Sequence, residues 1–197
     1  METNTEGRSP LRVLSEWIEE ARALGMKDPD AMTVATVNQS GAPSARIVLC
    51  RKVDDDSITF FTNYDSQKGH DLAQNPRAAA AFYWRELDRQ VRVEGQVAKV
   101  SREDSDAYFA GRPRGSQIAA RVSPQSQVIE GVAELLARHK VVEAELLGRA
   151  VERPPHWGGY RITATAVELW RAGEFRMHER LRYDRHGEAW KLSRLAP

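Results

Sequence analysis

The sequence has a single cysteine, no long apolar run and no excess of charge of one sign. Cys50, the one cysteine among 197 residues, excludes an intrachain disulfide and a cluster of metal-binding thiolates. The longest apolar stretch, residues 78–84, is far shorter than the roughly 20 residues that cross a membrane, so no membrane partner is expected. Because 29 basic residues stand against 28 acidic ones, the net charge is +1, and no nucleic-acid partner bound through bulk charge is expected.

Motifs for several common chemistries are missing as well. None of the 13 glycines builds the dinucleotide pattern G-x-G-x-x-G or the phosphate-binding loop G-x-x-x-x-G-K-[ST]. Neither G-x-S-x-G nor H-E-x-x-H occurs, and the five histidines are not spaced as metal ligands, so we expect no metal site. The first ten residues lack the apolar core of a signal peptide, which predicts a cytoplasmic protein. A phosphate ligand would have to be held by arginines, lysines and helix N-termini.

What the sequence does contain is the patterning of a globular protein, with 41% hydrophobic and 29% charged residues. The spacing of apolar residues predicts helices at 11–24, 67–74, 101–111, 116–122 and 123–146, and strands at 32–37, 46–51, 58–62, 78–84, 90–100, 160–170, 176–185 and 190–195. Strands in two runs without regular β-α-β alternation indicate an α+β fold with a mainly antiparallel sheet or barrel. We expect one domain overall, with a polar segment and helix at 1–27 before the main body at 28–197.

The most informative segment is 176–183, in which basic residues alternate with others. If it is a strand, then one face carries four side chains about 6.6 Å apart, from Arg176, His178, Arg180 and Arg182. Like charges at that spacing repel by about 2.5 kcal/mol at an effective dielectric near 20, so anions between them would relieve the row. The alternative is the solvated face of an edge strand, where arginines discourage association between sheets.

A second cationic cluster spans residues 112–116. Arg112 and Arg114 flank a proline, and Ser116 is expected to cap a helix that runs to about residue 122. A helix N-terminus beside two arginines is a good receptor for a phosphate dianion. The plainer alternative is ordinary capping with surface arginines.

A third cluster combines Arg46, Arg51 and Lys68. Lys68 lies in the first turn of its expected helix, where the helix dipole disfavours a cation unless an anion is bound there. A simple surface lysine is the alternative. Two aromatic residues near the cationic segments, Tyr108 and Trp170, could stack on a planar ring or fill the core.

Eight short motifs occur in a recognisable order: Arg46-Ile47-Val48-Leu49, Phe61-Thr62-Asn63, Ser66-Gln67-Lys68, Arg89-Gln90-Val91, Arg112-Pro113-Arg114, Gln125-Ser126, Trp157-Gly158-Gly159 and Arg176-Met177-His178. In this order the chain resembles the pyridoxamine 5′-phosphate oxidase family, over about residues 28 to 197. No single motif decides the resemblance, but their combination is specific.

The resemblance implies a fold, a cofactor and a set of binding residues. The fold would be an FMN-binding split barrel in a homodimer, with FMN at the subunit interface. FMN would be bound by Arg46, Ile47, Val48, Leu49, Phe61, Thr62, Gln67, Lys68, Gln90, Gln125, Ser126, Trp170 and Arg180. The substrate would be bound by Arg51, Tyr108, Arg112, Ser116, Arg176 and His178, of which Arg176 and His178 would also be catalytic.

The implied reaction is hydride transfer from C4′ of pyridoxamine or pyridoxine 5′-phosphate to N5 of FMN, which yields pyridoxal 5′-phosphate. Dioxygen would then reoxidise the flavin and become hydrogen peroxide. The cofactor carries the redox step, while the protein supplies orientation, chiefly by anchoring the substrate phosphate at Arg112. The phosphates of FMN and substrate would also offset the like charges of segment 176–182.

This chain departs from the family pattern at two positions. Gln67 stands where members often have arginine, and Arg51 stands where they usually have lysine, which changes hydrogen-bond geometry. The segment before the first helix is shorter than in many members, which implies a less complete cover over the site.

Two other functions fit parts of the sequence. Tyr183-Asp184-Arg185 also suits a related FMN oxidase of phenazine biosynthesis, whereas Tyr108 and residues 112–116 favour a substrate that carries a phosphate. A non-catalytic split-barrel protein that binds flavin or pyridoxal phosphate is the third alternative, against which the retained Arg176 and His178 speak.

Overall fold

A computed structural model of the protein describes residues 9–197. Residues 1–8, which belong to the expected polar N-terminal segment, lie outside the described residues. The helices are α1 (Pro10–Ala23), α2 (Gln67–Gln74), α3 (Arg102–Ala110), α4 (Arg114–Val122) and α5 (Val132–Glu145), with short 3₁₀ turns η1 (Arg85–Leu87) and η2 (Glu174–Arg176). The strands are β1 (Ala31–Val37), β2 (Pro43–Leu49), β3 (Lys52–Val53), β4 (Ser57–Asn63), β5 (Arg77–Trp84), β6 (Arg89–Lys99), β7 (Trp157–Arg171), β8 (Glu179–His186) and β9 (Ala189–Arg194). Among the described residues, no helix is both long and apolar enough to pass through a bilayer.

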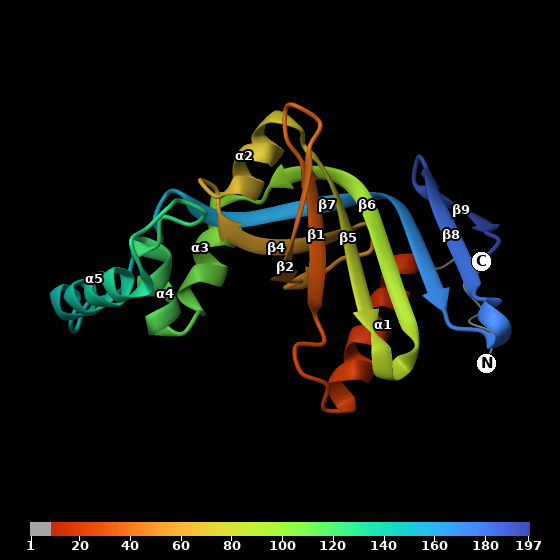
Figure 1. Ribbon diagram of the computed structural model, residues 1–197, viewed down its shortest axis with the longest axis horizontal. Helices are drawn as coiled ribbons and strands as arrows, with labels where there is room; N and C mark the ends of the chain where they lie inside the picture. Colours follow the sequence, from red (N-terminus) through yellow and green to blue (C-terminus); the bar gives the residue numbers. More distant parts are fainter. Residues whose placement is uncertain (1–8) are drawn as a thin grey trace.

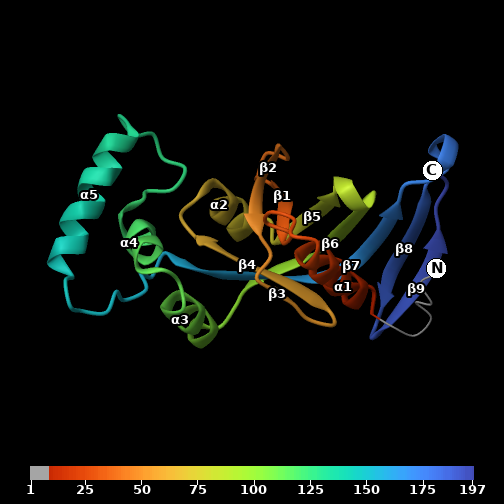
Figure 2. The ribbon, with the colours of Figure 1, turned by 90° about the horizontal axis from the view of Figure 1, so that it is seen from below.

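The molecule is elongated around one curled antiparallel sheet. Helices α3, α4 and α5 gather at one end, and the hairpin of β8 and β9 lies at the opposite end in both views (Figures 1 and 2). The strand order is β2-β1-β5-β6-β7-β4-β3, with β8 and β9 joined to β7 outside this path. The prediction of an α+β fold with a mainly antiparallel sheet is confirmed.

Strand β7 organises the sheet, because two strands share one of its edges. Strand β6 pairs with β7 along one edge. On the other edge of β7, β4 pairs with residues 157–163 and β8 pairs with residues 166–171. The register of β6 and β7 shifts at Gly95, a bulge that adds twist. A side chain at Gly95 would meet the Thr163 carbonyl oxygen at 2.1 Å, so only glycine permits this approach.

The main core lies between α1 and the sheet. Helix α1 is capped by the Ser9 hydroxyl, which accepts from the Leu11 N–H, and its apolar face meets buried side chains of the central strands. The strand residues that are fully buried include Met32, Val34, Phe60, Phe82, Val91, Val93 and Ile162. Cys50 belongs to this core, and burial raises the pKa of its thiol to about 12, so it stays protonated.

The structure corrects the expected strand at 176–185, which begins only at Glu179. Arg176 lies in the turn η2, and both Phe175 and Arg176 adopt left-handed backbone angles, with φ of 53° and 64°. The turn is tight because the Gly173 backbone packs against the Met177 carbonyl, with room for no side chain at 173. The expected alternation on one face therefore holds only for the strand residues at 180 and 182.

Three other boundaries differ from the prediction. The long helix begins at Val132, because residues 123–131 form an irregular segment. Helix α4 begins at Arg114, so Ser116 lies inside the helix and does not cap it. Strand β2 ends at Leu49, which leaves Arg51 between two strands.

Candidate active site

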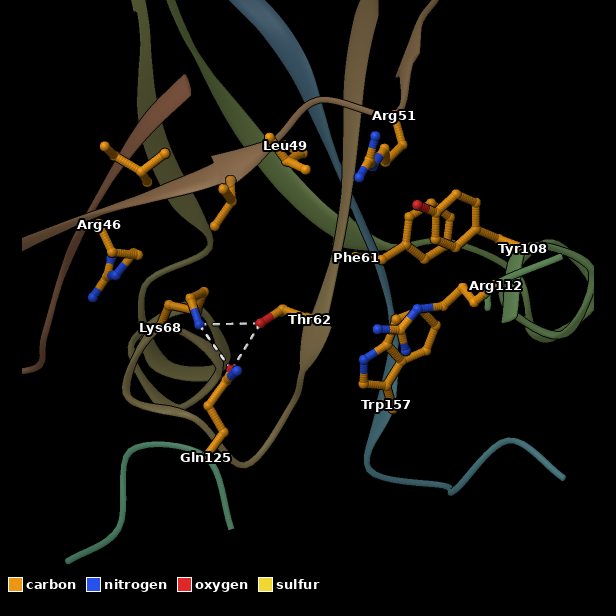
Figure 3. Close-up of a pocket in the computed structure, with 12 residues that line it drawn as sticks. Arg46, Leu49, Arg51, Phe61, Thr62, Lys68, Tyr108, Arg112, Gln125 and Trp157 are labelled. Atoms are coloured by element: carbon orange, nitrogen blue, oxygen red, sulfur yellow. Dashed lines mark hydrogen bonds between the residues drawn. The ribbon is translucent and has the colours of Figure 1, made fainter. Parts of the chain in front are cut away.

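A positively charged cavity of about 290 Å³ lies where β2, β4 and α2 approach α3 and the loop after α4 (Figure 3). It is lined by Arg46, Ile47, Val48, Leu49, Arg51, Phe61, Thr62, Lys68, Tyr108, Arg112, Gln125 and Trp157. Four of these side chains are cationic and none is a carboxylate. Such a lining favours an anionic ligand.

Lys68 is the most unusual cation of this cavity. It is 7% exposed, and its Nζ donates to Thr62 Oγ1 at 3.0 Å, Gln125 Oε1 at 3.0 Å and Ser66 Oγ at 3.2 Å. All three acceptors are neutral, and no carboxylate of the described residues lies within ion-pair distance of this ammonium group. Burial, and then the nearby charge of Arg46, lowers the pKa of Lys68 to about 8.

Arg46 is held from behind by a buried polar network. Its Nη1 donates to Thr36 Oγ1 at 2.7 Å, and Thr36 in turn donates to Asp71 Oδ2 at 2.6 Å. The Asp71 carboxylate is 2% exposed and lies 3.9 Å from Arg46 Nη2. Gln67 donates to the other Asp71 oxygen at 2.8 Å and does not line the cavity. Gln67 therefore supports Arg46 through Asp71.

Aromatic rings form the other wall. Tyr108 stacks on Phe61 with ring centroids 3.8 Å apart and planes inclined by 7°, and the nearly parallel ring of Trp157 lies beside this pair, 5.7 Å from Phe61 and 6.2 Å from Tyr108. Gly159 leaves room for the Phe61 ring, because a Cβ at position 159 would lie 2.8 Å from a ring carbon. Arg112 packs over Trp157 at 4.5 Å.

Arg112 has hydrogen-bonding capacity that the chain does not use. Its Nη1 is buried and has no partner within the described residues. Burial lowers the pKa of its guanidinium, and the Arg51 charge adds to this effect. Arg51 itself is paired with Asp30 at 3.0 Å. A buried unpartnered donor on a cation is the environment in which an anion binds well.

The remaining predicted residues do not line this cavity. Gln90, Trp170 and Arg180 are direct cross-strand neighbours on β6, β7 and β8, so their side chains share one face. The His178 ring packs on Trp170 at 4.7 Å, and its Nδ1 accepts from the Gly173 N–H at 3.3 Å. We call this group the β8 cluster; with the exposed Arg176 it comprises Gln90, Trp170, Arg176, His178 and Arg180.

The β8 cluster lies at the end of the molecule opposite to α3, α4 and α5 (Figures 1 and 2). The two remaining residues are near the cavity in sequence without lining it. Ser126, which follows Gln125, has a left-handed φ of 71°, and Ser116 is half-buried on α4, one turn after Arg112. One chain thus carries the predicted residues in two separate groups.

The charges of β8 are compensated by protein carboxylates, which corrects the expectation that ligand phosphates offset them. Arg180 binds the buried Glu168 through two hydrogen bonds of 2.8 and 3.2 Å. Arg182 binds Asp184 at 2.9 Å and Glu94 at 3.4 Å. These acidic residues lie on the neighbouring strands β6, β7 and β8. The sequence contains all of them, but only the register of the strands shows which arginine each one meets.

Trp157 is the lining residue that the sequence-based site prediction missed. It occurs in the Trp157-Gly158-Gly159 motif, where an aromatic residue precedes two glycines. The glycines are the available signal, because each leaves space that a neighbouring aromatic side chain occupies.

Two family models match the chain. The model described as pyridoxamine 5′-phosphate oxidase matches residues 18–145, and the pyridoxine 5′-phosphate oxidase C-terminal dimerisation region matches residues 157–197. The chain belongs to the pyridoxamine 5′-phosphate oxidase family. Membership confirms the resemblance seen in the sequence and the prediction of an oxidoreductase.

Relatives in this oxidase family align over nearly the whole chain. A pyridoxine/pyridoxamine 5′-phosphate oxidase of Burkholderia vietnamiensis is 52% identical over 191 residues, covering 95% of this chain and 89% of the relative. Another of the same name, from a Cyanothece species, is 48% identical over 189 residues, covering 96% and 89%.

Solved structures confirm the split-barrel fold of this family member. PhzG from Burkholderia lata 383, in complex with tetrahydrophenazine-1-carboxylic acid, has a TM-score of 0.93 at 31% identity, covering 100% of this chain and 97% of that one. A pyridoxamine 5′-phosphate oxidase-related, FMN-binding protein from Nostoc punctiforme has a TM-score of 0.79 at 16% identity, covering 97% and 99%, and shows likeness of fold alone.

Proposed function

We propose that the protein is an FMN-dependent oxidase that converts pyridoxamine 5′-phosphate or pyridoxine 5′-phosphate to pyridoxal 5′-phosphate. The observation that carries this proposal is that one cavity holds two cations without a counter-charge from the described residues, Lys68 and Arg112. Lys68, with Arg46, lies on one side of β4, and Arg112, with Tyr108, lies on the other (Figure 3). Two such groups suit two phosphorylated molecules bound side by side.

The cavity fits FMN by the chemistry of its donors. Lys68 lacks a counter-charge that a phosphate would provide, the Gln125 amide lies beside it, and residues 46–49 line the same cavity. The chemistry that FMN supplies when bound is acceptance of a hydride from C4′ of the substrate and return of the electrons to dioxygen, which becomes hydrogen peroxide. With the amine substrate, water then releases ammonia and leaves the aldehyde.

The residues of the chain orient the substrate for this step. Arg112 offers its unpartnered Nη1 to the substrate phosphate, and Tyr108 lines the cavity with it. Anchoring the phosphate fixes the distance of C4′ from the flavin, which converts binding energy into orientation. Because Nδ1 of His178 accepts from a backbone N–H, its Nε2 is left to donate to a substrate oxygen or nitrogen.

We propose further that the site is completed across a homodimer. The β8 cluster lies away from the cavity of its own chain, because β8 is at one end of the molecule and the strands β2 and β4 that carry the cavity are near its middle (Figures 1 and 2). Support comes from the match of residues 157–197 to a dimerisation region, because this range contains Trp170, Arg176, His178 and Arg180. A second copy would place its β8 cluster over the cavity, with FMN between the two chains.

A second candidate is oxidation of a reduced tricyclic phenazine precursor. The likeness to PhzG, which was solved with tetrahydrophenazine-1-carboxylic acid, favours it. The free guanidinium of Arg112 accepts a carboxylate as well as a phosphate.

Oxygen uptake by the purified flavin-loaded protein separates the two candidates. We expect uptake with pyridoxamine 5′-phosphate and pyridoxine 5′-phosphate, and at least a hundredfold lower kcat/KM with unphosphorylated pyridoxamine, since loss of the phosphate removes the anchor. Uptake with tetrahydrophenazine-1-carboxylic acid but with none of the vitamers would establish the second candidate in place of the first.

A further inference from the structure

A second cavity of about 300 Å³ adjoins the Phe61–Tyr108 ring pair. It is lined by Arg51, Lys52, Thr59, Phe61, Val100, Asp104, Tyr108 and Arg161. The ring pair and Arg51 are shared with the first cavity, and the other lining residues belong to the second alone. The proposed oxidase reaction uses none of these other residues.

Strand register places three polar side chains in one row along the floor of this cavity. Lys52 on β3 is the direct partner of Thr59 on β4, and Thr59 is the direct partner of Arg161 on β7. Direct cross-strand partners project from the same face of a sheet. A hydroxyl therefore lies between two cations.

Two of these groups are buried without a partner. Thr59 is 3% exposed, and its Oγ1 has no hydrogen-bond partner within residues 9–197. Arg161 Nε is likewise buried and unpartnered, and no carboxylate of residues 9–197 pairs with Arg161. Buried polar groups normally have partners, so two orphans in one cavity wall indicate a ligand that would satisfy them.

The surrounding charges define the ligand. Lys52 is already paired with Asp54 at 2.9 Å, and Arg51 with Asp30 at 3.0 Å, so Arg161 is the cation of the lining that lacks a counter-charge. Asp104, exposed at the rim, disfavours a dianion. The rings of Phe61 and Tyr108, with Val100, form an apolar wall.

We propose that this second cavity binds an aromatic monocarboxylate. The guanidinium of Arg161 offers its Nε–H and a neighbouring N–H to the two carboxylate oxygens, and the Thr59 hydroxyl donates a third hydrogen bond. The body of the ligand lies against the ring pair, where stacking is favourable. This inference does not depend on which substrate the first cavity takes.

Calorimetric titration of the flavin-loaded protein with benzoate tests the proposal. We expect saturable binding of benzoate, and at least tenfold weaker binding of benzyl alcohol, which has the ring without the charge, and of acetate, which has the charge without the ring. Arg161→Gln and Thr59→Val should each weaken benzoate binding several-fold or more. Arg112→Gln, which alters only the first cavity, should leave this binding event unchanged.

The melting temperature of Thr59→Val adds a readout that needs no ligand. Valine has the shape of threonine without the hydroxyl, so removing an orphaned donor should leave the melting temperature unchanged or raise it. Loss of benzoate binding in Arg112→Gln but not in Arg161→Gln, equal affinity for benzyl alcohol, or a clear drop in the melting temperature of Thr59→Val would each overturn the assignment.

Discussion

The Asp71 carboxylate lies 3.9 Å from the Arg46 guanidinium, beneath the floor of the cavity and almost completely out of solvent. Replacing Asp71 by asparagine leaves Arg46 without its counter-charge. Removing one partner of a fully buried pair costs about 3–5 kcal/mol. Because Arg46 is one-fifth exposed, we expect a loss of about 2 kcal/mol in the free energy of unfolding, measured with denaturant.

The matched control is Asp55→Asn, which breaks the exposed Arg12–Asp55 pair. It should leave the denaturation midpoint close to that of the parent. An equal effect of the two substitutions would show that burial at Asp71 has no special weight.

The affinity of the apoprotein for FMN should fall at alkaline pH because of Lys68. Its folded-state pKa of about 8 lies below the ordinary value of 10.5, so above pH 8 the ammonium that would bind a phosphate is lost. Between these values the unfolded chain holds more protons, so deprotonation of Lys68 makes the ligand-free fold more stable as pH rises. Flavin fluorescence quenching should show FMN affinity falling about tenfold per pH unit above 8.

The control for this effect is Lys68→Met, which cannot titrate. It should bind FMN more weakly at pH 7 and with a nearly flat pH profile. A profile in Lys68→Met as steep as in the parent protein would assign the titration to another group.

Arg112→Ala should act mainly on KM. Its unpartnered guanidinium is free to hold the substrate phosphate, and hydrogen bonds to charged groups contribute about 1.5–3 kcal/mol, or about 10- to 100-fold in KM. Steady-state oxygen uptake measures the change. Arg114→Ala is the comparison, since in the described part of the chain Arg114 bonds only the backbone carbonyls of Leu146 and Arg149; an equal rise in KM there would refute the anchoring role.

Gly173→Ala should lower kcat while flavin content stays normal. A methyl group at 173 would meet the Met177 carbonyl oxygen at 1.9 Å, so the turn carrying Arg176 and His178 must shift. Misplacing such groups by about 1 Å costs on the order of tenfold or more in rate. The control is Gly131→Ala, where the added methyl group meets only open space, and its kcat should equal that of the parent. An unchanged kcat in Gly173→Ala would show that the turn has no part in the reaction.

Mixed dimers test the assembly of the site. Lys68→Ala and His178→Ala chains should each be nearly inactive as pure homodimers. Co-expressed in equal amounts, they should recover about a quarter of parental activity, because half of the dimers are mixed and each mixed dimer has one site with both residues intact. Recovery near zero would place both residues in a site made by one chain.

Local patterning predicted much of the architecture. The spacing of Leu11, Leu14 and Ile18 predicted α1, and the antiparallel character followed from the succession of short strands. The turn at 173–178 could not be predicted in this way, because it depends on close packing between Gly173 and the Met177 backbone. The basic residues at every second position of this segment predict a strand, and nothing in that pattern reveals that the backbone packing at Gly173 makes a turn instead.

The candidate site could be predicted mainly from the order of the motifs along the chain. The cations at 46, 51, 68 and 112 were found in the sequence, and the fold brings all four to one cavity. Asp71 could not be singled out, since an aspartate on a short helix usually faces solvent, and only the packing of α2 on β1 buries it. The roles assigned to individual residues, and the division of the chain at residue 28, stay predictions.

The separation of the β8 cluster from the cavity within one elongated chain has a consequence for how the protein behaves on dilution. If each reaction centre is assembled from two chains, a lone chain holds two incomplete halves and turns over nothing. Specific activity should then decline once the concentration falls below the dissociation constant of the pair, and added flavin, by bridging the chains, should move that threshold lower.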